Sequence, residues 1–398
     1  MKEALPAIIL FFLLFLIANS GAITTPYIWI PNTDADTIMR FVGVNPDSFS
    51  TQDAPHGVAV DVDRNRAYVA SQHYNYPNNY CILDVFDLDG AAIRSIDTGG
   101  LTPCSNPAID QNGNVFFAYE SYVSKYDFSG NMIGIWVISD YTNTPAELFV
   151  DANGNPWITT GWSAVVVKLD GNNSDVILGA YNAGGFFTNT IGIAIDLNRV
   201  IVADYEQAKI FDLNYSGVKK NTYNLTSPPW GVKIDGSRNI IYSKTFENKV
   251  GKITPDGTKT EYDTCTSPTG LGIDETYVYV DCSGGDIYKH LLSNLSNWTV
   301  ISQTPSDTGT SSGDFTGFQY QAFTQGCINP INFSETNPKI NCSCNYSIDK
   351  NQAIDGNITT YGKGTLTLNA KLAFTNEHAS FDIAPNCKLE ITSKGEIE

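Results

Sequence analysis

The chain has 398 residues and a formal net charge of −18, with 24 Lys and Arg against 42 Asp and Glu. Nucleic acid and anionic membranes both demand basic clusters, so this acidity argues against either as a partner. Aromatic residues make up 12% of the chain and charged residues only 17%, which is expected of a β-rich extracellular protein rather than a disordered one.

The N-terminus is typical of a secreted protein. Met1-Lys-Glu precedes an apolar run over residues 4–18, and small residues follow at 20–22. This order predicts a signal peptide over residues 1–22. The run of about 15 residues is short for a membrane span, which needs about 20, but a retained N-terminal anchor stays open as the alternative. In either case we expect the rest of the chain to be secreted or held at the cell surface.

One apolar strand that ends in aspartate recurs six times downstream. A second apolar strand follows each copy after a turn, and the clearest unit, Ser227–Thr264, contains four short strands. The intervals between the aspartates are 49, 41, 45, 39 and 39 residues, which fits propeller blades of roughly 40–50 residues. The six first strands are Gly57–Asp61, Pro107–Asp110, Leu148–Asp151, Gly192–Asp196, Gly231–Asp235 and Gly270–Asp274.

Two incomplete pieces complement each other. Tyr27–Pro31 and Thr37–Val44 read as the second and third strands of a blade that lacks a first strand, whereas Thr316–Tyr320 reads as a first strand alone. Joining them closes a ring and removes exposed sheet edges. The predicted fold is therefore all-β, a seven-bladed β-propeller over residues 23–326 closed by N- and C-terminal strands. A six-bladed ring with loose ends is the alternative.

The best-preserved repeat carries a family resemblance. Asn248–Gly257, which reads NKVGKITPDG, and the Thr260-Glu-Tyr262 that follows resemble the repeat of the virginiamycin B lyase family, and more broadly NHL and YVTN propellers. The resemblance covers about residues 23–326. In the lyase family, Pro-His-Gly segments lead into the first strands of two blades and place catalytic groups, with nearby carboxylates, at the channel mouth.

Only Ala54-Pro55-His56-Gly57 matches that pattern, so the resemblance implies His56 as a candidate catalytic residue. The expected carboxylate is replaced by Ala54, and the nearest acid is Asp53. A lone histidine acts as a general base only if it is oriented and reached by a substrate. A histidine hydrogen-bonded at the channel rim is the structural alternative. The other blades carry Ala108, Ala146, Ile191, Trp230, Thr269 and Thr316 at this position.

The recurring aspartates suggest a cation site, because hard cations bind clustered carboxylates. Each aspartate also begins a turn such as Asp110-Gln-Asn-Gly-Asn114, where its side chain can accept a hydrogen bond from the backbone two residues on. We therefore interpret them as turn residues and predict no metal site. Gluconolactonase-type propellers hold a divalent ion with Glu and Asn in the channel, and no matching glutamate motif occurs here, so no cofactor is predicted.

The cysteines favour an oxidising compartment. Cys104 and Cys265 occupy the same position before a first strand, while Cys81 starts a third strand and Cys282 ends a second one. Because these segments lie on one face of a propeller, Cys81–Cys104 and Cys265–Cys282 are predicted disulfides. A zinc site at Cys342-Ser-Cys344 is disfavoured because no histidine has the required spacing. Four further cysteines, whose pairing stays open, are Cys327, Cys342, Cys344 and Cys387.

A long loop, Ser71–Cys81, is the best functional candidate. Tyr74, Tyr76 and Tyr80 alternate with asparagines in it, a mix that binding loops favour. It would lie on the same face as His56 and Trp230, although an ordinary surface loop is the plain alternative. We predict a monomeric module that binds an extracellular protein or glycan. The alternative is a channel-mouth lyase or lactonase, which a single histidine at the channel-mouth positions disfavours.

The C-terminal region differs in composition. Residues 327–355 are rich in Cys, Asn and Ser and read as a disulfide-stapled connector. Residues 356–398 contain short alternating strands that resemble the opening coils of a β-solenoid, with a small sandwich-like module as the alternative. Nine N-x-S/T sequons permit glycosylation, at Asn172, Asn214, Asn224, Asn294, Asn297, Asn332, Asn341, Asn345 and Asn357.

Overall fold

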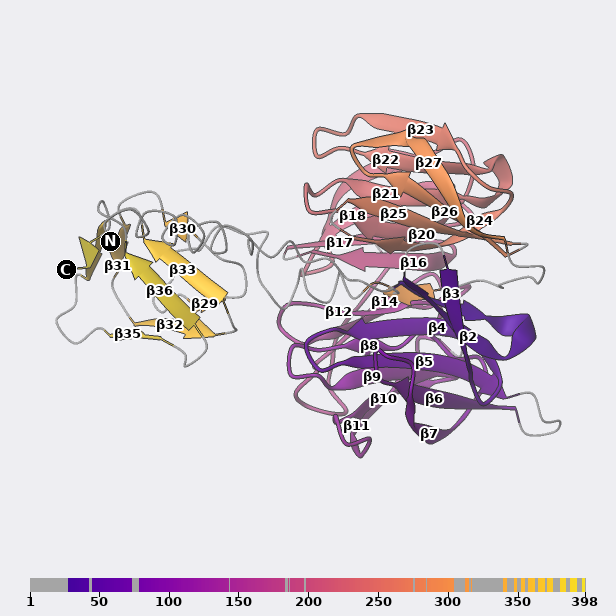
Figure 1. Ribbon diagram of the computed structural model, residues 1–398, viewed down its shortest axis with the longest axis horizontal. Helices are drawn as coiled ribbons and strands as arrows, with labels where there is room; N and C mark the ends of the chain where they lie inside the picture. Colours follow the sequence, from indigo (N-terminus) through magenta and orange to yellow (C-terminus); the bar gives the residue numbers. More distant parts are fainter. Residues whose placement is uncertain are drawn as a thin grey trace, which may run out of the picture.

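The computed structural model describes most of the predicted propeller and parts of the C-terminal region (Figure 1). The predicted signal peptide, Tyr74 and Tyr76 lie outside the described residues, as do Cys327, Cys342 and Cys344. Within the described residues, no helix is both long enough and apolar enough to cross a bilayer. The described residues are 28–42, 45–73, 79–142, 144–182, 185, 187–196, 198–274, 276–283, 285–303, 312–314, 316, 339–341, 347–348, 352–354, 357–361, 364–368, 371–374, 380–383, 387–391 and 396–397.

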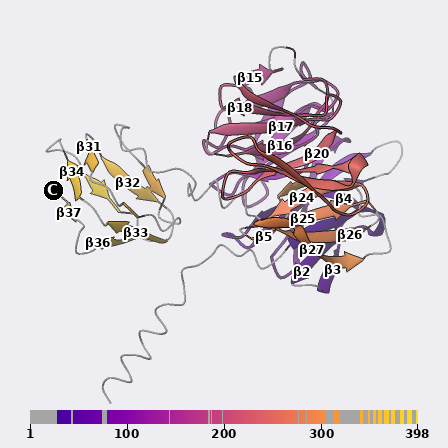
Figure 2. The ribbon, with the colours of Figure 1, turned by 90° about the horizontal axis from the view of Figure 1, so that it is seen from above.

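Seven antiparallel sheets are arranged around one axis, which confirms the seven-bladed propeller (Figures 1 and 2). The first three blades are β1 (Ile28–Asn32), β2 (Thr37–Val42) and β3 (Asn45–Ser50), with the turn η1 (Thr33–Ala35); β4 (Ala54–Asp61), β5 (Arg66–His73), β6 (Tyr80–Phe86) and β7 (Ala92–Leu101); and β8 (Ala108–Ile109), β9 (Val115–Tyr119), β10 (Tyr122–Tyr126) and β11 (Met132–Val137). The next two are β12 (Leu148–Val150), β13 (Pro156–Thr159), β14 (Val166–Leu169) and β15 (Ile177–Tyr181); and β16 (Thr190–Ile195), β17 (Arg199–Asp204), β18 (Lys209–Asn214) and β19 (Lys219–Asn224). The last two are β20 (Pro229–Ile234), β21 (Ile240–Lys244), β22 (Lys249–Ile253) and β23 (Lys259–Asp263), with the turn η2 (Thr245–Glu247); and β24 (Pro268–Ile273), β25 (Tyr277–Cys282), β26 (Asp286–Leu291) and β27 (Asn294–Gln303).

The recurring aspartates form the turns between the first and second strands. Asp110 Oδ1 accepts a hydrogen bond from the amide of Asn112 at 2.9 Å. The aspartates of the next four blades repeat this bond to the amide two residues on. In the second blade, Asp61 accepts the amide of Arg64 instead, at 3.1 Å. The turn interpretation is therefore confirmed, since each carboxylate satisfies its own backbone.

The N-terminal sheet closes the ring by packing between the second and seventh blades. Trp29 and Phe41 share one buried apolar cluster with Val58 of β4 and with Tyr279 and Ile287 of the seventh blade. Both faces of the N-terminal sheet are thereby covered by neighbours. The amphipathic strands of one blade cannot bury both faces alone, so this packing is what makes the ring complete.

A C-terminal strand, β28 (Ser312–Asp314), adds to the innermost edge of the second blade. It pairs in parallel with β4, Gly313 lying opposite Val58, and it also contacts β24 of the seventh blade. The Thr316 hydroxyl donates to the backbone carbonyl of Ile273. The predicted partner of β1, Thr316–Tyr320, lies outside the described residues apart from Thr316. The described closing strand thus begins four residues earlier than predicted and bonds to β4.

Beside β28, a buried ion pair links two blades. Glu147, just before β12, and Lys233 on β20 are 3.0 Å apart between Oε1 and Nζ, and Lys233 is only 2% exposed. Glu147 also accepts the backbone amides of Ile193 at 2.8 Å and of Gly313 at 3.3 Å. The Lys233 ammonium lies 4.9 Å from the centre of the Phe149 ring. One carboxylate therefore joins the fourth, fifth and sixth blades to the C-terminal strand.

Lysines on third strands also connect neighbouring blades. Lys125 donates to the carbonyl of Gly171 in the next blade at 2.9 Å, and Lys252 donates to the carbonyl of Leu292 at 2.9 Å. Lys168 makes the equivalent bond to Tyr215 at 3.3 Å. These charge-assisted bonds supplement the apolar contacts between blades.

The C-terminal strands stack in parallel as three coils of a β-solenoid and form a separate group in Figure 1. Ile358, Leu366, Leu368 and Leu372 of the middle coil are fully buried. The first coil falls within residues 327–355, which the sequence analysis assigned to a connector. The coils are β29 (Lys339–Asn341), β30 (Ser347–Ile348) and β31 (Gln352–Ile354); β32 (Ile358–Tyr361), β33 (Gly364–Leu368) and β34 (Lys371–Phe374); and β35 (Phe381–Asp382), β36 (Cys387–Ile391) and β37 (Glu396–Ile397).

The buried ion pair generates a stability prediction. We expect Lys233→Met to lower the free energy of unfolding by about 3–5 kcal/mol, because it leaves the Glu147 carboxylate buried without its cation. Glu147→Gln combined with Lys233→Met should recover most of this loss, since the amide oxygen can still accept the amide of Ile193. Urea unfolding of the two variants and the wild type measures both effects. A single variant as stable as the double variant would contradict the prediction.

Candidate functional site

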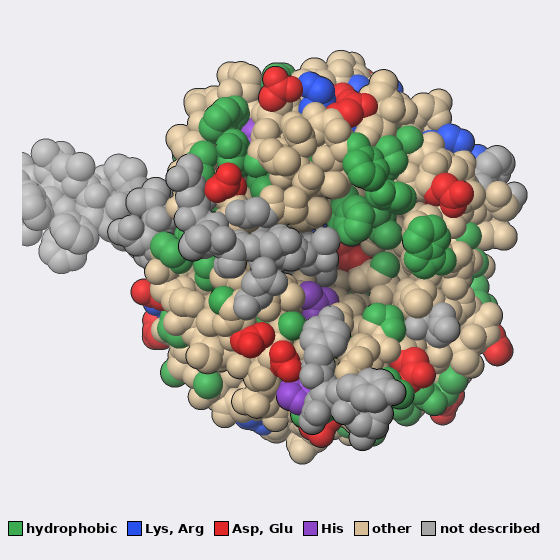
Figure 3. Space-filling model, turned by 90° about the vertical axis from the view of Figure 1, so that its right-hand side faces the viewer, with side chains coloured by type: hydrophobic (Ala, Val, Ile, Leu, Met, Phe, Trp, Pro, Cys, Tyr) green, Lys and Arg blue, Asp and Glu red, His purple; other side chains and the backbone are tan. Residues whose placement is uncertain are grey.

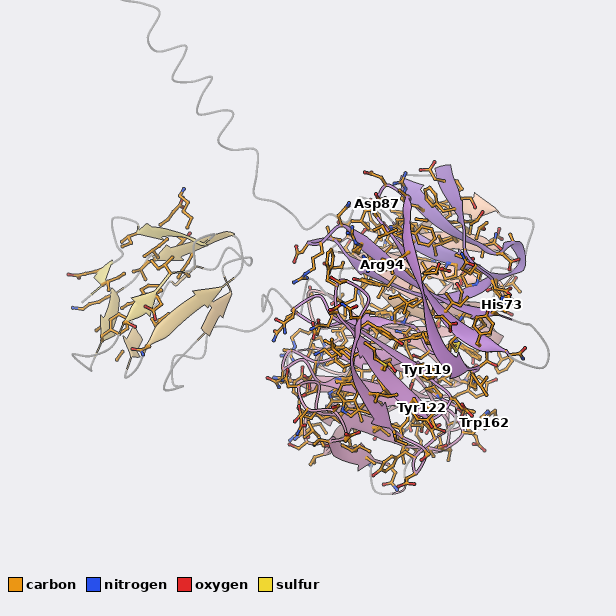
Figure 4. All side chains as sticks on the ribbon, turned by 90° about the horizontal axis from the view of Figure 1, so that it is seen from below. His73, Asp87, Arg94, Tyr119, Tyr122 and Trp162 are labelled. Carbon is orange, nitrogen blue, oxygen red and sulfur yellow. A yellow bond between two sulfur atoms is a disulfide. The ribbon has the colours of Figure 1, made fainter. Side chains whose placement is uncertain are left out.

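The candidate site lies on the end of the propeller where second strands turn into third strands and the chain leads into each first strand. We term this end the mouth face. Figure 3 shows it hollowed near its centre, with a histidine side chain beside the hollow and hydrophobic side chains gathered at one side. His73 and Trp162 lie toward this side of the propeller in Figure 4, whereas Asp87 and Arg94 lie toward the other.

His56 is held in place by backbone. Its Nε2 lies 3.0 Å from the carbonyl oxygen of Cys104 in the next blade, and because a carbonyl only accepts, Nε2 carries the hydrogen. Desolvation of the ring lowers the pKa of His56 to about 4, against the opposing effect of its backbone hydrogen bonds. The imidazole is therefore neutral at pH 7. Such a low pKa makes it a weak general base at neutral pH.

A second histidine lies on the same blade beside a carboxylate. His73, at the end of β5, has Nδ1 2.7 Å from Oδ2 of Asp53, and both side chains are about a quarter exposed. The Tyr80 ring lies against His73, with 4.5 Å between ring centres. Asp53, which the sequence placed near His56, is thus beside His73. Sequence reasoning missed this pair because the two residues are 20 positions apart, Asp53 just before β4 and His73 at the end of β5.

The base of the predicted tyrosine loop is fixed as expected. His73 and Tyr80 are opposite each other on β5 and β6, so the two ends of the loop meet. The adjacent Cys81 forms the predicted disulfide with Cys104, and Cys265 forms the other with Cys282. Each pair has its Cα atoms 6.0 Å apart. Tyr74 and Tyr76 lie outside the described residues, so their roles stay predictions.

Trp230 belongs to an aromatic group from two blades. Its ring meets the Tyr205 ring edge-on, 5.6 Å between centres and 89° between planes. Tyr205 also contacts Phe246, with 6.0 Å between the two ring centres, and the Phe246 side chain is 67% exposed. We term Tyr205, Trp230 and Phe246 the aromatic platform. The sequence analysis missed Tyr205 and Phe246; both sit on the turn after the second strand, in adjacent repeats, and that spacing could have revealed them.

No cluster of three or more metal-ligating side chains occurs among the described residues. The six turn aspartates are engaged with their own backbone, and several also pair with a lysine or arginine, as Asp110 does with Lys125 at 3.1 Å. Among the described residues, the mouth face offers aromatic surface and two histidines.

Comparisons with known proteins agree with this fold. No protein family matches the chain, and no curated protein matches its sequence. Among solved structures, an inactive variant of virginiamycin B lyase from Staphylococcus aureus with quinupristin is 16% identical, with a TM-score of 0.55 over 71% of this chain and 90% of that one. A streptogramin B lyase is 14% identical, with a TM-score of 0.53 over 71% and 96%. A protein of unknown function from Desulfotomaculum acetoxidans is 11% identical, with a TM-score of 0.58 over 72% and 97%. At these identities the likeness shows the propeller fold alone.

The lowered pKa of His56 predicts acid sensitivity. Between pH 6.5 and 4 the unfolded chain takes up a proton at this histidine and the folded protein does not, so stability present at pH 7 is lost as the pH falls. The shift corresponds to about 3 kcal/mol by pH 4. We expect the wild type to lose this much more stability than His56→Gln between pH 7 and pH 4, as measured by urea unfolding at both pH values. Equal losses in the two proteins would contradict it.

Proposed function

We propose that this virginiamycin B lyase-like propeller is a secreted or cell-surface binding module whose mouth face holds an extracellular protein or glycan. The observation that carries the proposal is the aromatic platform, where Phe246 is 67% exposed and Tyr205 contacts both Phe246 and Trp230. Exposed aromatic clusters of this kind dominate binding interfaces because they offer large contact area at low entropic cost. The propeller would act as a monomer.

Three features support this proposal. The two disulfides suit an oxidising compartment, as does the predicted signal peptide. The buried Glu147–Lys233 pair and β28 occupy part of the ring interior, whereas the exposed side chain of Phe246 lies at the mouth. The weakly basic His56 disfavours acid–base chemistry at neutral pH.

Alanine variants test the binding role. We expect Phe246→Ala and Trp230→Ala each to weaken attachment to the cognate protein or glycan at least tenfold, since loss of one buried aromatic contact is worth about 1.4 kcal/mol or more. Tyr74→Ala and Tyr76→Ala should act likewise. Phe128→Ala is the matched control, because Phe128 is also exposed but lies on a turn at the opposite face. The measurement is binding of the secreted chain to arrays of extracellular proteins and glycans. Attachment unchanged in all four variants would rule the mouth face out.

A channel-mouth lyase is the second candidate, and the Asp53–His73 pair favours it. A carboxylate 2.7 Å from one imidazole nitrogen orients the ring and leaves the other nitrogen to exchange a proton. Incubation with quinupristin and mass spectrometry of the product tests this candidate. Turnover should fall at least 100-fold in His73→Ala if the pair is catalytic, and in His56→Ala if the resemblance to the lyases extends to that residue. Absence of any product with the wild type, or turnover untouched by both variants, would remove this candidate as drawn.

A further inference from the structure

The aromatic platform has the properties of a site for positive charge. We propose that Tyr205, Trp230 and Phe246 bind a lysine or arginine side chain, so that the partner is a protein presenting a basic peptide. This inference rests on the proposed function and narrows its ligand. Aromatic faces attract cations through the ring quadrupole, and tryptophan does so most strongly.

The rings of the platform are not occupied by the protein's own cations. Elsewhere in the propeller, internal cations lie over aromatic rings: Lys125 over Phe116 at 4.9 Å, Lys168 over Trp157 at 4.7 Å and Arg66 over Phe128 at 4.8 Å. Within the described part of the chain, no lysine or arginine lies over Tyr205, Trp230 or Phe246. The perpendicular arrangement of Tyr205 and Trp230 presents a face of one ring beside an edge of the other. The platform thus keeps its cation-binding capacity for an external group.

The charges around the platform favour a cation. Glu206, next to Tyr205, is exposed and makes no ion pair among the described residues. Glu247, next to Phe246, is paired with Lys244 at 2.6 Å, and Lys244 is itself fully buried. Lys209 is bonded to Gln207 at 2.8 Å. Figure 3 shows acidic side chains at the margins of the hydrophobic patches on this face. The whole chain carries −18, so a basic partner is attracted from a distance as well.

Two buried polar side chains, Asn189 and Ser227, belong to segments that adjoin the platform. The backbone carbonyl of Asn189 accepts the amide of Tyr205 at 2.9 Å, while the side-chain Oδ1 of Asn189 has no hydrogen-bond partner among the described residues. Ser227 is three positions before Trp230, and its buried hydroxyl also has no hydrogen-bond partner among the described residues. Buried polar groups in native proteins are normally bonded. Both oxygens are enclosed by the protein, so the aromatic rings and Glu206 are the groups that an external cation would meet.

Matched peptides test the proposal on the whole secreted chain. The probes are a ten-residue Gly- and Ser-rich peptide with two central lysines, the same peptide with both lysines acetylated, and a neutral glycan ladder. Isothermal titration at low salt should show the lysine peptide binding at least tenfold more tightly than the acetylated one, because acetylation removes the charge and keeps the length. Phe246→Ala should weaken the lysine peptide at least tenfold, whereas Phe128→Ala should leave its affinity within twofold.

The charge of Glu206 gives a second readout. Glu206→Gln should weaken the lysine peptide two- to fivefold and reduce the dependence of its affinity on salt, with no change in folding because the side chain is exposed. Equal affinity for the two peptides, or lysine-peptide binding untouched by Phe246→Ala, would overturn the inference. If the glycan ladder binds and Phe246→Ala abolishes it, the proposed function stands and only the cationic ligand is wrong. If no probe binds, the inference fails, and the array experiment decides the proposed function separately.

Discussion

The packing of one blade against the next is the constraint on which the ring depends, and a lysine on the third strand reinforces it in three of the blades. Lys125, Lys168, Lys252 and Lys289 occupy one register position, opposite Phe116, Trp157, Ile241 and Tyr279 of the second strand. Three of them reach a backbone carbonyl in the following blade. Apolar faces of sheets hold together without a preferred direction, because burial of apolar area is not directional. A bond from a charged donor, worth roughly 1.5–3 kcal/mol, is directional, and it favours one rotation of the blade against the next in these three cases.

A buried lysine also links blades in the interior of the ring. Lys233 projects from a first strand instead of a third one, and its ammonium is neutralised by Glu147, which also accepts the amide of Gly313. Gly313 has φ of 98° and lies against Val58 and Asn106, so a larger side chain would clash with the carbonyl of Val58. Glycine is therefore required where β28 enters the ring. Lys233, Glu147 and β28 occupy this part of the interior, while Phe246 and the partly exposed His73 lie on the mouth face.

The features that could be predicted from the sequence are those whose geometry is set by residues close together in the chain. The turn aspartates, the blade count and both propeller disulfides follow from short motifs repeated at a fixed interval, so their geometry is set within one or two repeats. The parallel pairing of β28 with β4 was not predictable, because it joins residues more than 250 positions apart and the strand contains only Ser312, Gly313 and Asp314. The same holds for Lys233 and Glu147, which are 86 positions apart. In the candidate site, His56 and Trp230 were identified from their position in the repeat. Tyr205, Phe246 and the pairing of Asp53 with His73 were recognised only from contacts in the structure.

The distribution of cations explains why the mouth face differs from the rest of the surface. Lys125, Lys168, Lys233 and Lys244 are all buried, so they neutralise internal carboxylates and carbonyls and contribute little to the potential outside. Ten Asp and Glu side chains are buried among the described residues as well, and the surface that remains keeps an excess of negative charge. Most aromatic rings in the propeller lie beneath these lysines or within apolar clusters. Among the described residues, no lysine lies over the rings of Tyr205, Trp230 and Phe246. Phe246 is largely exposed, and the acidic Glu206 is next to Tyr205. Such a surface combines negative potential with uncovered aromatic faces. Each contribution alone is weak, but both attract the same positive charge, so the surface selects positively charged groups over neutral ones.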